Sequence, residues 1–112
     1  MRKKGYKGRC TKVASSKSET VCRLYDDLMI AYLRNLEAES DIVSIQTNAP
    51  LEGTDFTSDF LCRREGGDYM VRECVYRKYL TKPLTAQLLD TSRAYWLKHG
   101  IYDWGVVVDA EK

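Results

Sequence analysis

Two acidic residues lie in the two arms of a predicted β-hairpin. The segments 57–64 and 69–76 are rich in β-branched and aromatic residues, and a four-residue turn with two glycines separates them. Such a pattern is typical of a hairpin. Asp59 lies in the first arm and Glu73 in the second. The sequence therefore predicts two carboxylates on neighbouring antiparallel strands.

The expected register of this hairpin determines how close the two carboxylates come. If the turn centres on Gly67, Asp59 lies opposite Val75 and Leu61 lies opposite Glu73. Asp59 and Glu73 then share one face of the sheet as diagonal neighbours, because residues of the same parity point to the same side.

Two carboxylates held this close in apolar surroundings repel each other, and a divalent cation such as Mg²⁺ or Mn²⁺ would remove the conflict. A cation in this position could activate water and stabilise charge on a phosphodiester. The alternative is that both acids are solvated and paired with arginines of the same strands. The candidates for that pairing are Arg63, Arg72 and Arg77.

The elements around the hairpin predict an α/β fold. A long helix is expected from the capping-box pattern Ser16–Glu19 to about residues 38–40. A strand is expected at 42–48, a second helix from Pro83 to Gly100, and a last strand at 104–109. The order is α-β-β-β-α-β, a mixed sheet flanked by helices. The stripe of the first helix comprises Val21, Leu24, Tyr25, Leu28, Tyr32 and Leu36, and that of the second comprises Leu84, Leu88, Leu89, Thr91, Tyr95 and Trp96.

The charge distribution divides the 112-residue chain into an arm and a body. We expect residues 1–15 to form a basic flexible arm and residues 16–112 to form a single domain. The arm is free of acids, so it suits contact with DNA phosphates, although a solvated tail is the simpler alternative. The candidate DNA-binding residues are Arg2, Lys3, Lys4, Lys7, Arg9 and Lys12.

Several classes of protein are disfavoured. No apolar run approaches the length of a bilayer span, and the N-terminus lacks the apolar core of a signal peptide, so a cytoplasmic protein without membrane contact is expected. Cys10, Cys22, Cys62 and Cys74 lack the usual zinc-ligand spacing, so reduced thiols are expected and a zinc site is a weaker alternative.

Four segments together resemble a known family, the PD-(D/E)XK nuclease superfamily and, within it, the N-terminal catalytic domain of TnsA-type transposon-end endonucleases. The resemblance spans residues 19–111 and implies a restriction-endonuclease-like core. The segments are Asp41–Gln46, Thr57–Leu61, Met70–Cys74 and Ser92–Val107, which contain the words DIVSIQ, TSDFL, MVREC and SRAYWLKHGIYDWGVV.

The resemblance implies a role for each acid. Asp59 would be the central metal ligand and Glu73 the second carboxylate, with Mg²⁺ or Mn²⁺ as the cofactor. A carboxylate of the first helix usually completes the site. Glu19, Asp26 and Asp27 are the candidates, and their spacing from the first strand favours Asp26 or Asp27.

The chain departs from the family pattern in two ways. The lysine expected two residues after Glu73 is replaced by Val75, so Arg77, Lys78 or Lys82 would have to supply the positive charge. The chain also ends just after the last core strand, whereas the resemblance to TnsA-type proteins implies a second, C-terminal domain. It is therefore expected to be either a fragment or a freestanding domain.

Two functions follow as expectations. The first is a metal-dependent DNA endonuclease that resembles the DNA-end-cleaving subunit of a heteromeric transposase, encoded by a bacterium, a phage or a mobile element. Asp59 and Glu73 would act there with Arg77 or Lys78. The alternative is a catalytically degenerate relative that binds DNA or a protein, either another transposition subunit or a host defence nuclease that it inhibits.

Overall fold

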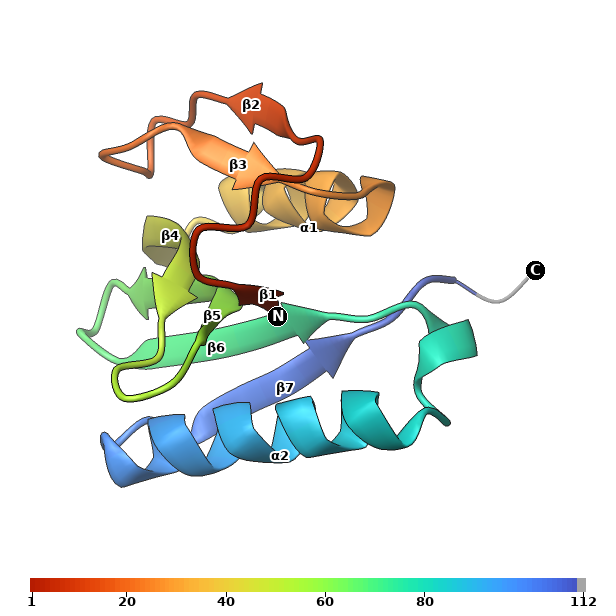
Figure 1. The fold of residues 1–112 in the computed structure, drawn as a ribbon. Helices are drawn as coiled ribbons and strands as arrows, with labels where there is room; N and C mark the ends of the chain where they lie inside the picture. The colour runs from red at the N-terminus through yellow and green to blue at the C-terminus, as the bar shows by residue number, and fades with distance from the viewer. Residues whose placement is uncertain (111–112) are drawn as a thin grey trace.

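The structure is a computed structural model that describes residues 1–110, and it places a mixed sheet between two helices (Figure 1). The expected α/β fold with a mixed sheet flanked by helices is confirmed, and α1-β4-β5-β6-α2-β7 follows the predicted order. Within residues 1–110, neither helix combines the length and the apolar character needed to cross a membrane. The elements are β1 (Arg2–Lys3), β2 (Thr11–Val13), β3 (Cys22–Leu24), α1 (Asp27–Ala38), β4 (Ile42–Pro50), β5 (Phe56–Arg64), β6 (Tyr69–Cys74), the 3₁₀ helix η1 (Arg77–Tyr79), α2 (Pro83–Lys98) and β7 (Asp103–Val107).

Strand β5 is the centre of the sheet. It pairs antiparallel with β4 along one edge and with β6 along the other, and β6 pairs parallel with β7. The short strand β1 also pairs with β5, at Arg2–Thr57. Because Thr57 pairs at the same time with Pro50 of β4, β1 must lie on the β6 edge of β5. Strand β1 therefore occupies this edge beyond the point where β6 leaves it.

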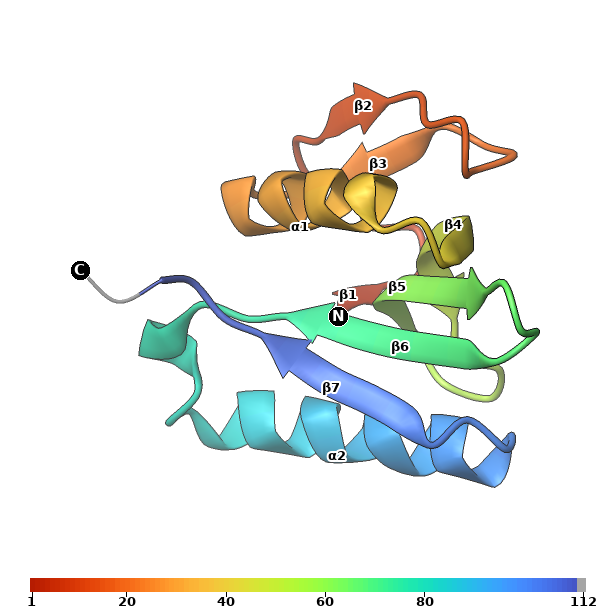
Figure 2. The same cartoon turned by 180° about the vertical axis from the view of Figure 1, so that it is seen from behind.

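The two faces of the sheet are covered by different elements. Helix α1 and the β2–β3 hairpin lie over one face, and α2 lies over the other (Figures 1 and 2). Met29, Leu33 and Leu36 of α1 pack with Phe60 of β5 in the larger core, while Trp96 of α2 packs in the smaller core. The smaller core comprises Ala49, Leu51, Val71 and Trp96.

The predicted start of the first helix is wrong. Helix α1 begins at Asp27, and residues 22–24 form a strand instead. The N-cap is Asp26, whose side chain accepts a hydrogen bond of 2.8 Å from the Met29 amide. Cys22 and Leu24 are buried with Arg23 exposed between them, a period of two that belongs to a strand. Leu24 fits both this alternation and the predicted helical stripe, so the helical spacing extended the predicted helix too far toward the N-terminus.

The predicted hairpin is present, but its register differs by two residues. Leu61 pairs with Val71 rather than with Glu73. The turn closes through a 2.7 Å hydrogen bond from the Arg64 amide to the Asp68 carbonyl, which places its centre one residue earlier than Gly67. A shift of two preserves parity, so each side chain keeps its face of the sheet.

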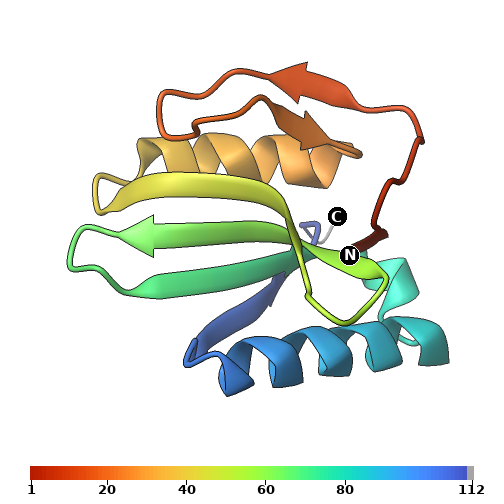
Figure 3. The ribbon, with the colours of Figure 1, turned by 60° about the vertical axis from the view of Figure 1, so that its left-hand side comes forward.

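Residues 1–15 run from the sheet to the far side of the β2–β3 hairpin (Figure 3). Strand β1 pairs with β5, and β2 pairs with β3 over Thr11–Val13. Just beyond this segment, the Lys17 ammonium donates to the carbonyls of Leu36 and Glu39 at the end of α1. Residues 1–15 thus contact both the sheet, through β1, and the strand β3 that covers it, through β2.

Helix α2 begins at Pro83 and is followed by Gly100, as predicted. Gly100 adopts a φ of +81°, the left-handed conformation that ends many helices. The predicted apolar stripe is only partly correct, because Leu84 and Thr91 are exposed. Trp96 is buried as predicted, and the other buried residue of α2 is Ser92, which the stripe did not include.

Candidate active site

The structure brings Asp59 and Glu73 together at the point where β5 and β6 separate. Backbone pairing of the two strands reaches Phe60–Arg72. Beyond this pair, hydrogen bonds from backbone amides to side-chain carboxylates take the place of backbone hydrogen bonds between the strands. The Asp59 amide donates to Glu73 Oε1 at 2.8 Å, and the Cys74 amide donates to Asp59 Oδ2 at 2.8 Å. Both acidic residues are completely buried. Their positions are therefore fixed by the backbone of the opposite strand.

A buried chain of hydrogen bonds holds the far side of Glu73. Ser92 Oγ of α2 donates to Glu73 Oε2 at 2.5 Å and accepts from the indole N–H of Trp104 at 2.9 Å. The indole N–H of Trp96 donates to Ser58 Oγ at 2.8 Å, and Ser58 Oγ lies 3.3 Å from Ser92 Oγ. Since the single Ser92 proton goes to the carboxylate, Ser58 donates to Ser92. The two tryptophans thus support the site as core residues.

Burial dominates the electrostatics of this pair. Loss of water raises the pKa of Glu73, and the adjacent charge of Asp59 raises it further. The positive N-terminus and the serine hydrogen bonds act in the opposite direction. Burial also raises the pKa of the Cys74 thiol, with further increases from Asp59, Asp26 and Glu73. Several negative groups therefore surround Cys74.

The positive charge next to the pair comes from the main chain. The α-ammonium of Met1 lies 3.3 Å from Asp59 Oδ1, 3.4 Å from Asp59 Oδ2 and 3.9 Å from Glu73 Oε1. Strand β1 delivers this group because it occupies the edge of β5 that β6 has left. The sequence pattern did not reveal it, because a terminal amine leaves no trace in composition or spacing.

The donor set of the pair fits a hard divalent cation. Asp59 Oδ1 is buried and accepts no hydrogen bond. Among residues 1–110, its ion-pair partner is the Met1 ammonium. Mg²⁺ is commonly held by one or two carboxylates, with water and substrate phosphate as the other ligands. In the part of the chain that the structure describes, no three His, Cys, Asp or Glu side chains gather as a metal site. Asp59 and Glu73 are the two carboxylates that would hold a cation here.

The candidates for a third carboxylate have different positions. Asp26 lines the same pocket as Met1, but its two oxygens accept from the Met29 amide and from Arg2, at 2.8 and 3.2 Å. Asp27 is exposed and lines a different pocket. Glu19 precedes α1 altogether, in an exposed segment.

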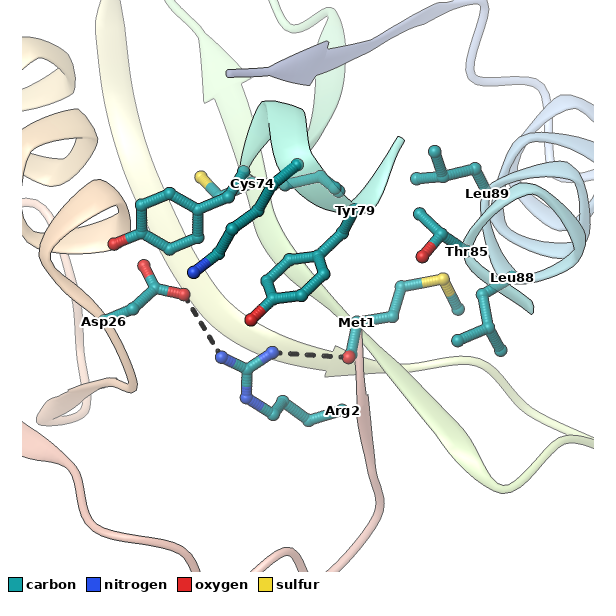
Figure 4. A pocket seen from close by; sticks show the side chains of 11 residues that line it. Met1, Arg2, Asp26, Cys74, Tyr79, Thr85, Leu88 and Leu89 are labelled. Carbon is teal, nitrogen blue, oxygen red and sulfur yellow. Dashed lines mark hydrogen bonds and ion pairs between the residues drawn. The ribbon is translucent and has the colours of Figure 1, made fainter. Parts of the chain in front are cut away.

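A pocket of about 360 Å³ is lined by Met1 and Cys74, which contact Asp59, but not by Asp59 or Glu73 themselves, and Figure 4 shows its lining. Arg2, Asp26 and Tyr79 form a polar side, while the Met1 side chain lies toward Leu88 of α2. Val75, two residues after Glu73, also lines this pocket. The lining residues are Met1, Arg2, Asp26, Cys74, Val75, Tyr76, Lys78, Tyr79, Thr85, Leu88 and Leu89.

The three residues predicted to supply the positive charge that Val75 lacks differ in their contacts. Arg77 is bound to Asp109, to which its amide and its guanidinium donate at 2.6 and 2.7 Å. Lys78 lines the pocket, with its ammonium 5.1 Å from the ring centre of Tyr79. Lys82 also lies over Tyr79, at 4.8 Å, without lining the pocket. Lys78 is thus the lysine that the structure brings to the pocket.

The candidate DNA-binding residues of the arm are mostly accessible. Arg2 is the exception, since it pairs with Asp26 and lies over the rings of Tyr6 and Tyr25. The other five residues are exposed and lie along the surface from β1 to β2. They are Lys3, Lys4, Lys7, Arg9 and Lys12.

No protein-family model matches this chain, and no curated protein matches it.

Proposed function

We propose that this protein is a metal-dependent DNA endonuclease whose cation is held by Asp59 and Glu73. The observation that supports it is one buried pair of adjacent carboxylates in which an oxygen lacks a hydrogen-bond partner, beside a pocket. Two buried acids are costly to keep ionised without a cation, so such a pair is a feature of sites that use one. Mg²⁺ or Mn²⁺ would supply activation of water and stabilisation of charge on the phosphate.

The residues around the pair would orient it. The Asp59 and Cys74 amides each hold one carboxylate, and Ser92 fixes Glu73 from α2. Carboxylates fixed in this way need little rearrangement when they receive a cation. Lys78 is the proposed positive side chain for the scissile phosphate, because it lines the pocket, whereas Arg77 contacts Asp109.

DNA would approach along the basic arm. The exposed lysines of residues 3–12 contact phosphates without reading sequence. The resemblance to TnsA-type nucleases favours transposon-end DNA as the substrate, other transposase subunits as partners, and action in the cytoplasm of a bacterium.

Nicking of supercoiled plasmid in Mg²⁺ or Mn²⁺ tests the proposal. The wild type should nick the plasmid, chelation should stop it, and Asp59→Asn, which removes the charge but keeps the shape, should lower the rate by at least about a hundredfold. Asp55→Asn is the matched control, since Asp55 is exposed in the loop before β5. An inactive wild type, or equal nicking by wild type and Asp59→Asn, contradicts the proposal.

A second function, binding without catalysis, is favoured by two observations. The Met1 ammonium already offsets one negative charge of the carboxylate pair, and Val75 leaves the pocket without the expected lysine. In this alternative the fold binds DNA, a transposition subunit or a defence nuclease. It predicts that Mg²⁺ and Mn²⁺ leave the melting temperature unchanged, whereas a cation site stabilises the fold by linkage.

A further inference from the structure

The N-terminal segment lies where a cation would bind. Strand β1 replaces β6 along the edge of β5, and this places the Met1 ammonium between the two carboxylates. The ammonium contacts both oxygens of Asp59, at 3.3 and 3.4 Å. The side chain of Met1 is 1% exposed, so the first residue of the segment is inserted, whereas Lys3 and Lys4 are exposed.

A divalent cation would need the same oxygens. The other three carboxylate oxygens of the pair already accept hydrogen bonds, from the Asp59 amide, the Cys74 amide and Ser92. Asp59 Oδ1 accepts none, and the Met1 ammonium is its ion-pair partner. A metal ion on Oδ1 and an ammonium beside it would repel each other strongly in this buried setting.

We infer that the N-terminal ammonium is a displaceable occupant of the cation site: a divalent cation binds Asp59 and Glu73 as Met1–Lys3 leaves β5. The inference rests on the proposed cation site and describes its regulation. In the metal-free protein the ammonium offsets one negative charge of the buried pair. The site is thus closed by its own chain until metal and DNA compete for it.

The attachment of the segment is slight enough to be reversible. Strand β1 comprises only two residues, and its neighbouring contacts are the Lys4 amide to the Asp55 carbonyl at 2.8 Å and the Thr57 hydroxyl to the Arg2 carbonyl at 3.1 Å. A further anchor is the half-buried ion pair of Arg2 with Asp26. Short edge strands of this kind open with a small part of the free energy of global unfolding.

Release would link metal binding to DNA binding. Arg2 would leave Asp26 and join the exposed lysines that follow it, so the freed segment presents more positive charge to phosphates. By reciprocity, DNA that holds the segment away from β5 tightens metal binding by the same factor that metal tightens DNA binding.

Isothermal titration with Mn²⁺ tests the inference on the full chain, with Met1 as first residue verified by mass spectrometry. Nα-acetylation removes the competing charge. The acetylated chain should bind Mn²⁺ about tenfold more tightly, within the range of about 5–150-fold typical of coupled sites. Without metal it should melt at a lower temperature than the unmodified chain, because the buried carboxylates lose their counter-charge.

A second variant covers the case in which the acetylated chain fails to fold. Arg2→Ala removes the anchor to Asp26 and should also tighten Mn²⁺ binding, by a smaller factor, while Lys98→Ala, at an exposed position in the last turn of α2, should leave it unchanged. Unchanged or weaker Mn²⁺ affinity in both Arg2→Ala and the acetylated chain overturns the inference. If the modified chains bind Mn²⁺ as tightly as the wild type and the wild type still nicks plasmid, the inference about Met1 is refuted and the nuclease proposal stands. If the modified chains bind Mn²⁺ more tightly but no nicking occurs, only the nuclease proposal is refuted.

Discussion

At the scale of single residues, Glu73 shows how burial and charge act together. Its carboxylate is completely buried, next to Asp59, and both factors raise its pKa above that of a free glutamate. The neighbouring amide and hydroxyl donors hold it in place without removing this effect. Its protonation is therefore coupled to the stability of the fold.

The pH dependence of stability has a defined sign. Between the unfolded pKa of glutamate, about 4.3, and the raised folded value, the native state binds more protons than the unfolded state, so stability falls as pH rises through this window. Glu73→Gln removes the titration and should flatten the profile, by at most about 1.4 kcal/mol per pH unit. Urea unfolding at several pH values, from about 5 to about 8, measures the change across this window.

Glu65→Gln provides the control for that profile, because Glu65 is exposed in the hairpin turn. This variant should follow the wild-type curve. A Glu73→Gln profile parallel to that of the wild type would mean that Glu73 titrates as a solvated acid.

At the scale of elements, α2 is fastened to the sheet through polar groups as well as through its apolar face. Ser92 lies completely buried between Glu73 of β6 and Trp104 of β7, and it bonds to both. The neighbouring Trp96 extends this contact to Ser58 of β5. One helical turn of α2 therefore connects three strands.

Ser92→Ala should destabilise the protein by about 1–3 kcal/mol, because it leaves the Trp104 N–H and the Glu73 carboxylate short of a buried partner. Thr91→Ala, one residue away on the exposed side of the same helix, should have an effect near zero. Guanidinium unfolding of the two variants measures the difference. Equal effects would show that the network adds nothing to helix packing.

At the scale of the whole molecule, the basic segment follows the surface from β1, beside the proposed cation site, to β2. If residues 1–12 contact DNA, log Kd should depend steeply on log salt concentration. Replacing Lys3, Lys4 and Lys7 by glutamine should reduce the slope by about 2–3, because each phosphate that a lysine neutralises contributes about 0.9. Fluorescence anisotropy over a salt series gives the slope. An unchanged slope would place the DNA elsewhere.

Strands β4, β5 and β6 could be predicted well from the sequence, because alternation and the glycine turn are local signals. Asp59 and Glu73 are close although the predicted register was wrong by two residues. A shift of two residues leaves each side chain on the same face of the sheet. The β2–β3 hairpin was missed because Leu24 fits both the predicted helical stripe and the strand alternation that it shares with Cys22. The position of Met1 depends on where β6 leaves β5, a tertiary feature that no local pattern records.

The proposed function depends above all on a divalent cation between Asp59 and Glu73, and titration of the full chain with Mn²⁺ tests this most directly. We predict one ion bound per chain, with affinity reduced at least about tenfold in Asp59→Asn, a loss of about 1.4 kcal/mol, and unchanged in Asp55→Asn. An absence of Mn²⁺ binding by the wild type, or equal binding by Asp59→Asn, would contradict a cation site at this pair.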